Sequence, residues 1–240
     1  MCGRFALILG REEIAAHFEL SELPGLVEPR YNISPGQEIL TVVEDEGGER
    51  VGRFMRWGLV PSWARELSSG YRMINARAES LTERPAFRGP LRRQRCIIPA
   101  TGFYEWKQTG ADKKPYFIRS PEDEPLALAG LWERWWPPEV EDRSEVEPLY
   151  SCTIITVPAA GGVEGIHHRM PAVLPREVWE SWLSPRNQAV EELREMLLSL
   201  PQRVELLAYP VSRRVNRADV EGPELIVPQE ERPGDLFSGQ

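Results

Sequence analysis

Short strand-like segments follow one another from residue 39 to residue 157, and this succession constrains the fold more than any other feature of the sequence. Each segment is rich in β-branched or aromatic residues and is bounded by proline, glycine or acidic residues, a pattern typical of strands. The segments are 39–44, 51–58, 95–100, 102–107, 115–120, 126–132 and 151–157. So many short strands favour a β-rich, barrel-like core.

Helical signals are confined to the periphery of this region. They occur at 11–20, 175–183 and 187–198, where apolar residues recur with helical spacing or acidic residues occupy the first turn. Residues 204–211 return to strand, and the acidic, proline-broken stretch 133–149 indicates a surface loop. We therefore predict one α+β domain over residues 1–228, with peripheral helices, followed by a disordered tail at 229–240.

The composition is that of a soluble protein inside the cell. Of 240 residues, 41% are apolar and 28% are charged, a balance typical of folded chains. No apolar run is long enough to cross a membrane, and the apolar stretch after Met1 is too short for a signal peptide. We expect a cytoplasmic protein without a membrane partner.

Three cysteines and three histidines supply few metal ligands. Cys2, Cys96 and Cys152 form no Cys-x-x-Cys pair, and no carboxylate stands at ligand spacing from a histidine. No zinc or iron motif is therefore recognisable. The neighbours His167 and His168 would point to opposite sides of a strand. We expect no metal and no cofactor.

Charge is distributed unevenly along the chain. The net charge is −8, yet residues 50–95 hold eleven arginines and only three glutamates. Because salt screens charges over about 8 Å, distant acidic residues do not cancel this local basic field. The field favours phosphate groups and hence nucleic acid. An arginine-rich chain, here with 26 arginines and three lysines, can equally carry a solvated basic face.

Cys2 acquires unusual chemistry when Met1 is removed, as methionine aminopeptidase does where the second residue is small. The chain then begins with a cysteine that bears both a free α-amine and a thiol. Their ordinary pKa values, about 8 and about 8.5, make both groups partly nucleophilic near neutral pH. The pair can attack a peptide or ester carbonyl, or condense with an aldehyde to a five-membered thiazolidine. The FALIL segment after Gly3 would hold Cys2 at the edge of the core.

The block from 57 to 79 combines aromatic and basic residues. Trp57 and Trp63 offer stacking faces, and Arg77 follows Asn75 by two residues. Aromatic planes interleaved with arginines are typical of single-strand nucleic-acid surfaces. Tryptophans are equally common in cores. The asparagine is either a turn residue whose hydrogen bonds are satisfied or a fixed hydrogen-bond partner for a reacting oxygen. The spacing leaves both alternatives open.

Glu105 lies among aromatic residues in the segment GFYEWK (102–107). Loss of hydration there would raise its pKa and suit it to general acid–base catalysis, although strand alternation also allows it to face solvent. The segment IHHRMP (166–171) adds two imidazoles. A histidine near a carboxylate and an amine can move protons at neutral pH, and the same histidines can also be surface residues.

Taken together, these motifs resemble the SRAP family, the SOS response-associated peptidases or abasic-site-processing proteins. The resemblance runs in order over nearly the whole chain, from residue 2 to about 227. It rests on the motifs MCGRF (1–5), RYNISPG (30–36), WGLVPSW (57–63), INARAE (74–79), CIIPATGFYEWK (96–107), TIIT (153–156) and IHHRMPAVL (166–174). The fold that it implies is one α+β domain around a barrel-like core with a positively charged cleft.

The resemblance also implies roles for particular residues. Cys2 would become covalently linked to the ring-opened aldehyde of an abasic deoxyribose, and Asn75 would hydrogen-bond near the linkage. Glu105 would handle protons during Schiff-base and thiazolidine formation. The motif register assigns the catalytic histidine to His167, with His168 in the variable position.

A second set of positions matches residues that hold DNA in the family. Arg4 and Arg77 would grip the phosphates beside the lesion, and Pro35 and Trp63 would wedge or stack beside the abasic nucleotide. Some relatives carry a second aromatic residue directly after Trp63, where this chain has Ala64. Stacking at this point would then be weaker or supplied elsewhere.

The resemblance therefore implies a monomer that captures abasic sites in single-stranded DNA during the DNA damage (SOS) response, acting at the nucleoid. Its covalent link would shield the site, with weak strand-cleaving lyase activity if the imine persists. Two alternatives remain open. One is a peptidase that uses the Cys2 thiol, even if only to remove Met1, and the other is a non-catalytic module that binds single strands.

Overall fold

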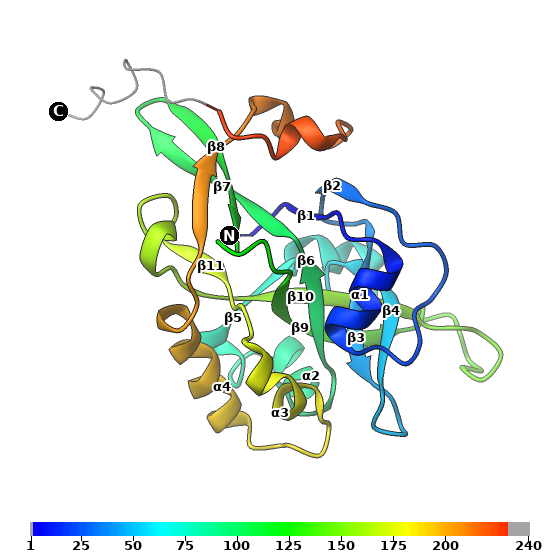
Figure 1. The fold of residues 1–240 in the computed structure, drawn as a ribbon. Coiled ribbons are helices and arrows are strands. Elements are labelled where there is room, and N and C mark those ends of the chain that lie inside the picture. The colour runs from blue at the N-terminus through cyan, green and yellow to red at the C-terminus, as the bar shows by residue number, and fades with distance from the viewer. Residues whose placement is uncertain (1, 230–240) are drawn as a thin grey trace.

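The computed structural model describes residues 2–229 (Figure 1). Its strands are β1 (Phe5–Leu7), β2 (Arg30–Ile33), β3 (Glu38–Glu44), β4 (Arg50–Trp57), β5 (Asn75–Arg77), β6 (Arg95–Ala100), β7 (Gly102–Thr109), β8 (Asp112–Arg119), β9 (Leu126–Trp135), β10 (Leu149–Pro158), β11 (Arg169–Pro171) and β12 (Leu207–Pro210). Its α-helices are α1 (Arg11–Phe18), α2 (Pro85–Arg93), α3 (Trp179–Leu183) and α4 (Val190–Ser199). Short 3₁₀ helices include η2 (Ala78–Ser80) and η6 (Arg213–Asn216).

Five strands close into a barrel in the order β10–β4–β3–β6–β9, and β9 pairs again with β10. The pairs are antiparallel except for β10 with β4. All six residues of β6 are buried, because α2 and α3 pack on this strand while it also faces the barrel interior. The expected α+β fold with a barrel-like core is confirmed.

A second, five-stranded sheet runs in the order β12–β8–β7–β1–β2. The chain passes from the barrel into this sheet at Thr101, between β6 and β7. Gly102 follows, and a Cβ atom there would lie 2.5 Å from the Phe117 ring, so only glycine allows this close approach. Figure 1 shows the β7–β8 hairpin at one end of the molecule and α2, α3 and α4 at the other.

Most predicted elements are confirmed, with small shifts at their ends. Each of the seven predicted strands in 39–157 exists, and the expected surface loop lies between β9 and β10. The predicted helices correspond to α1, to α3 with the 3₁₀ turn before it, and to α4. The tail expected at 229–240 falls, apart from residue 229, outside the described residues. Within the described part of the chain, no helix is long and apolar enough to span a membrane.

Helix α2 was not predicted, since the region was expected to be strand-like throughout. Gly89 and Pro90 lie inside the helix, and both residue types disfavour it intrinsically. Packing overrides this preference, because Phe87 and Leu91 are buried on one face together with Ala86 and Pro90. Tertiary burial rather than local propensity therefore determines this element.

Candidate active site

The start of the described chain is anchored beside two strands. Cys2 is fully buried just before β1, deeper than the core-edge position expected from sequence. Its carbonyl oxygen accepts a hydrogen bond of 2.7 Å from Nδ2 of Asn75, at the start of β5. The carbonyl of Arg4 accepts one of 2.9 Å from the backbone N–H of Tyr104 on β7. Cys2 is thus fixed between the INARAE and FYEWK motifs.

Glu105 faces the interior, which resolves the alternative left open by strand alternation. Its residue is only 3% exposed, and burial raises the pKa of its carboxyl group. Burial also raises the pKa of the Cys2 thiol, and the negative charge of Glu105 raises it further. The two side chains therefore interact electrostatically, and both favour their protonated forms.

A cavity of about 460 Å³ opens over this carboxylate. Its walls come from β7, β8, η6 and the segment before β11: Glu105, Trp106, Lys113, His167 and Asn216. Trp106 Nε1 donates a hydrogen bond of 2.8 Å to Asn216 Oδ1, which ties η6 to β7. The cavity thus joins a buried carboxylate, an imidazole and an ammonium group in one solvent-accessible space.

The two histidines do not point apart, and that expectation is wrong. Their rings stack with centroids 4.3 Å apart, because they lie in a bend before β11 rather than in a strand. His167 Nδ1 accepts a hydrogen bond of 3.0 Å from the Arg169 N–H. Burial lowers the pKa of His167, and the adjacent His167 lowers the pKa of His168. Both imidazoles are therefore mainly neutral at pH 7.

An ion pair that was not predicted joins the INARAE and IHHRMP motifs. Arg169 Nη2 donates a 2.9 Å hydrogen bond to Glu79 Oε2, and Nη1 donates to Oε1. The same Nη2 donates to the Thr156 carbonyl at 2.6 Å. Arg169 is only 7% exposed, so this bidentate pair fixes IHHRMP to INARAE and orients His167. The sequence did contain a signal for this ion pair, because one motif carries Arg169 and the other carries Glu79.

Arg4 and Arg77, both expected to grip phosphates, have different surroundings. Arg4 is partly buried, and its Nη1 donates to Asn32 Oδ1 at 2.6 Å and to the Val215 carbonyl at 2.9 Å. Burial lowers its pKa. Arg77 is exposed at the end of β5 and forms no ion pair within residues 2–229. Arg77 is therefore the guanidinium that the fold presents to solvent.

The two expected stacking residues lie in turns outside the cavity lining. Pro35 is half-buried in the turn between β2 and β3, and Trp63 is 65% exposed. Ala64, in the place of a second aromatic residue, is buried, and its carbonyl accepts a hydrogen bond from Trp135 Nε1. This position therefore belongs to the core and cannot present a stacking surface.

A different aromatic residue stands beside the Pro35 turn. Tyr71 is 64% exposed, and the Arg56 guanidinium lies 5.5 Å from its ring centre. Gly36, with φ of +87°, leaves room for both side chains, and Arg56 Nη1 donates to the Gly36 carbonyl at 2.7 Å. Sequence reasoning did not single out Tyr71.

Three cavity residues were also not predicted as functional: Trp106, Lys113 and Asn216. For Lys113 a signal existed, because the only three lysines of the chain all lie between residues 107 and 114. Within residues 2–229, no three histidine, cysteine, aspartate or glutamate side chains come together as metal ligands.

Comparisons with known proteins match nearly the whole chain. The family model described as SOS response associated peptidase (SRAP) matches residues 1–218. The abasic site processing protein YoqW of Bacillus subtilis is 43% identical over 229 residues, covering 94% of this chain and 99% of that protein. The abasic site processing protein HMCES of Gallus gallus is 34% identical over 271 residues, covering 96% of this chain and 78% of that protein.

The fold is shared with solved structures. A crystal structure of a protein from Bacteroides thetaiotaomicron superposes with a TM-score of 0.81 at 24% identity, covering 95% of this chain and all of that one.

Proposed function

This chain belongs to the SRAP family, and we propose that it processes abasic sites in single-stranded DNA by forming a covalent link through Cys2. The observation that carries the proposal is the placement of Cys2, with its carbonyl held by Asn75 at 2.7 Å and its thiol under the influence of the buried Glu105. The relatives named above carry abasic site processing in their names. Removal of Met1 is the premise of the chemistry.

The α-amine of Cys2 begins the reaction. Its lone pair attacks the C1′ aldehyde of the ring-opened sugar, a C–N bond forms, and the carbonyl oxygen leaves as water to give an imine. The thiol then adds to the C=N carbon, its proton passes to the nitrogen, and the thiazolidine ring closes. The two steps release one water and need no oxidant. Because burial raises the pKa of the thiol, the thiol suits the second step, attack on an activated C=N bond, better than the first.

Glu105 and His167 serve proton transfer. A carboxyl group with a raised pKa can take a proton from the attacking amine and return it to the departing oxygen near neutral pH. The neutral imidazole of His167, in the same cavity, can assist sugar opening or reversal of the adduct. Asn75 Oδ1 is buried and accepts no hydrogen bond from residues 2–229, so it is available to the Cys2 amine or a sugar hydroxyl.

Recognition uses charge and shape, because an abasic nucleotide offers no base edge. Arg77 contacts a backbone phosphate beside the lesion, as electrostatic binding of single strands requires. Pro35 and Trp63 contact the neighbouring bases. Arg4 acts chiefly by shaping the site, since its Nη1 is already bound by Asn32 and the Val215 carbonyl.

The peptidase alternative is less well supported. A cysteine peptidase depends on a thiolate with a lowered pKa, whereas burial and Glu105 raise the pKa of Cys2. The basic segment 50–95 is also unnecessary for hydrolysis of a small peptide. Self-removal of Met1 would not distinguish the two functions, because it is also compatible with crosslinking.

The decisive experiment is a denaturing gel with single-stranded DNA that contains one abasic site. Protein shown by intact mass to lack Met1 is incubated with this DNA and with undamaged DNA of the same sequence. We expect a heat-stable, shifted band only with abasic DNA and wild-type protein, and no band with Cys2→Ala. Absence of the band with Met1-free wild-type protein would overturn the proposal. Peptide hydrolysis or plain DNA binding would then take its place.

A further inference from the structure

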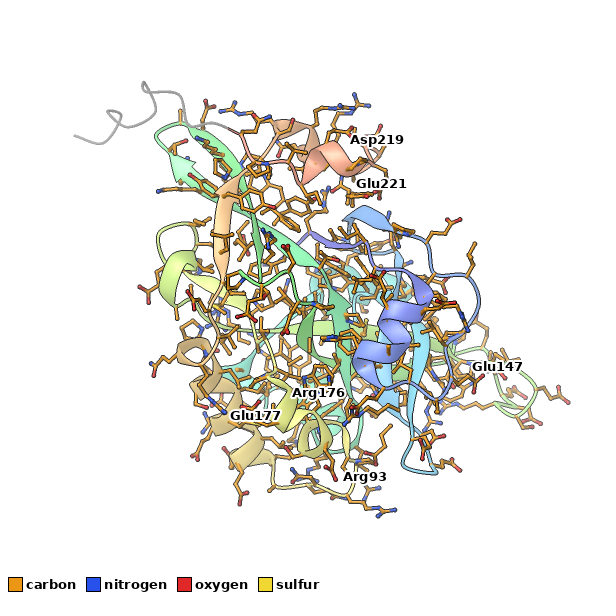
Figure 2. The ribbon with its side chains drawn as sticks, viewed as in Figure 1. Arg93, Glu147, Arg176, Glu177, Asp219 and Glu221 are labelled. Carbon is orange, nitrogen blue, oxygen red and sulfur yellow. The ribbon has the colours of Figure 1, made fainter. Side chains whose placement is uncertain are left out.

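Helix α2 carries a row of arginines on its outer face. Arg84 is the N-cap residue, and Arg88 and Arg92 follow at intervals of four, so the three lie on one side of the helix about 6 Å apart along its axis. All three are exposed, as is the adjacent Arg93. Figure 2 shows Arg93 at the end of the molecule opposite Asp219 and Glu221. Glu83 is the only acidic residue between 80 and 93.

The positions of these arginines are electrostatically unfavourable for the helix. Like charges four residues apart repel one another on a helix. Arg84 stands at the N-terminus, where the helix dipole is positive and favours acidic residues, yet the first turn contains none. Only Arg92 and Arg93, in the last turn, suit the dipole. A row that opposes stability and lies on the surface indicates a role outside folding.

Nine arginines of the described chain form ion pairs with carboxylates, and eight of these nine lie after residue 118. Arg84 and the three arginines of α2 form neither an ion pair nor a side-chain hydrogen bond within residues 2–229. The same holds for Arg65, Arg72 and Arg77. Unpaired guanidinium groups are therefore concentrated between residues 65 and 93.

The helix is held rigidly on the barrel. The buried Arg95 donates hydrogen bonds to the carbonyl oxygens of Leu91 at 2.6 Å and Arg92 at 2.7 Å, at the end of α2. It also donates to carbonyls of α3 and the loop that follows, including Asn187 at 2.9 Å. Burial lowers the pKa of Arg95 to about 10. The exposed row is thus presented on a fixed scaffold.

We propose that the outer face of α2 is a second binding site for the sugar–phosphate backbone of DNA, which holds the strand that flanks the abasic site. This inference rests on the proposed function. Arg77 belongs to the proposed active site, and Arg84 follows it by seven residues, which span at most about 25 Å. A strand that leaves Arg77 can therefore reach the row within a short flank. Arginine suits this role because its planar guanidinium binds phosphate oxygens in pairs.

The test compares two triple variants that lose the same charge. The first, Arg84→Gln/Arg88→Gln/Arg92→Gln, removes the row. The control, Arg176→Gln/Arg194→Gln/Arg203→Gln, removes exposed or half-exposed arginines that are paired with carboxylates. Binding constants are measured from 50 to 200 mM salt with a single strand of seven nucleotides and one of thirty, each with a central stable abasic analogue. Single-turnover crosslinking is measured on the matching true abasic strands.

We expect wild-type binding of the long strand to depend more steeply on salt than binding of the short strand. Each phosphate contact on a single strand contributes about 0.7 to the slope of log K against log salt, so loss of the row should reduce the long-strand slope by about 2. The short-strand slope and the short-strand crosslinking rate should stay at wild-type values. The control variant should match wild type on both strands.

Two outcomes would overturn the inference. One is an unchanged long-strand slope in the row variant, and the other is an equal reduction in the control variant, which would indicate net charge alone. A failure of the proposed function has a separate signature, because wild-type protein would then form no adduct even with the short strand. Melting temperatures of both variants, expected to stay near that of wild type, establish that the proteins are folded.

Discussion

Three buried cysteines in two regions of the molecule show how environment separates a reactive group from a structural one. Cys96 and Cys152 lie in the barrel, and Cys2 lies where the barrel meets the second sheet. All three are fully buried, and burial raises the pKa of all three thiols. Burial alone therefore does not distinguish the site from the core.

The difference lies in the neighbours. The barrel thiols respond only to desolvation and, for Cys96, to Cys152, whereas Cys2 also responds to Glu105. Around Cys2 the fold has gathered a carboxylate, the polar side chain of Asn75 and a cavity that reaches His167. A thiol becomes part of a site when titratable groups share its space.

The largest expected effect comes from exchanging the thiols for hydroxyls. Cys2→Ser keeps the α-amine but cannot close the sulfur ring, so we expect the heat-stable adduct to fall by more than about 10³-fold, since covalent capture depends on this nucleophile. An imine should still form and be trapped by borohydride. Cys152→Ser should crosslink at the wild-type rate, measured per folded molecule on denaturing gels. A stable adduct from Cys2→Ser would show that the thiol is unnecessary.

Glu105→Gln should produce the next largest effect. The amide cannot exchange a proton, so the rate of adduct formation should fall by roughly 10²–10⁴-fold, the range typical of general acid–base catalysis. Single-turnover rates from pH 5 to 8 provide the measurement. Both rates should rise with pH as the Cys2 α-amine loses its proton, and the wild type should show an additional rise as the Glu105 carboxyl group ionises, which the variant lacks. Equal profiles for the two proteins would remove Glu105 from the proton pathway.

Much of the fold follows from the sequence because its strands are short, regularly punctuated and buried. β-Branched runs such as CIIPA (96–100) and TIITV (153–157) favour strands both locally and in the tertiary structure. Helix α2 does not follow, because Gly89 and Pro90 oppose a helix that only packing against β6 and β9 stabilises. Barrel closure through β9 and β10 likewise depends on long-range strand pairings that no local sequence pattern predicts.

The site was predictable at the level of motifs but not of contacts. The residues around Cys2 were identified because their motifs, taken together and in order, resemble the SRAP family, whereas each motif alone left alternatives open. The stacked pair His167 and His168 was misjudged, because a bend rather than a strand sets their direction. Tyr71 was missed because an isolated tyrosine carries no signal until the fold places it beside a turn, and Lys113 was missed although the chain's three lysines cluster between residues 107 and 114.

A smaller effect, on stability rather than on crosslinking, is expected from a substitution in the barrel. Gly130 lies between the barrel strands, and a Cβ atom there would lie 2.8 Å from Cys96 Sγ and 2.9 Å from Ile98 Cδ1. Gly130→Ala should therefore lower the free energy of unfolding by about 1–3 kcal/mol through overpacking. Urea unfolding measures this change. The crosslinking rate per folded molecule should stay unchanged, and a reduced rate would show that barrel packing is coupled to the site.

The smallest expected effect is a pH-dependent difference in stability between the two regions. The raised pKa of Glu105 means that the folded protein binds this proton more tightly than the unfolded chain. Stability should therefore fall as pH rises from the ordinary carboxyl pKa, 4.5, through the higher folded value. Glu105→Gln removes this loss, so its advantage over wild type in urea unfolding should be small at pH 4.5 and should grow toward pH 7.

Cys152→Ser provides the matched control, because its surroundings contain no carboxylate that perturbs the thiol. Its unfolding free energy should differ from wild type by a constant amount between pH 4.5 and pH 7, where the thiol does not ionise in either state. The same pH trend in both variants would show that the loss of stability arises elsewhere in the chain. A trend confined to Glu105→Gln would show that ionisation of the buried carboxyl group near Cys2 lowers the stability of the fold. It would also show that no such loss arises around the barrel thiols.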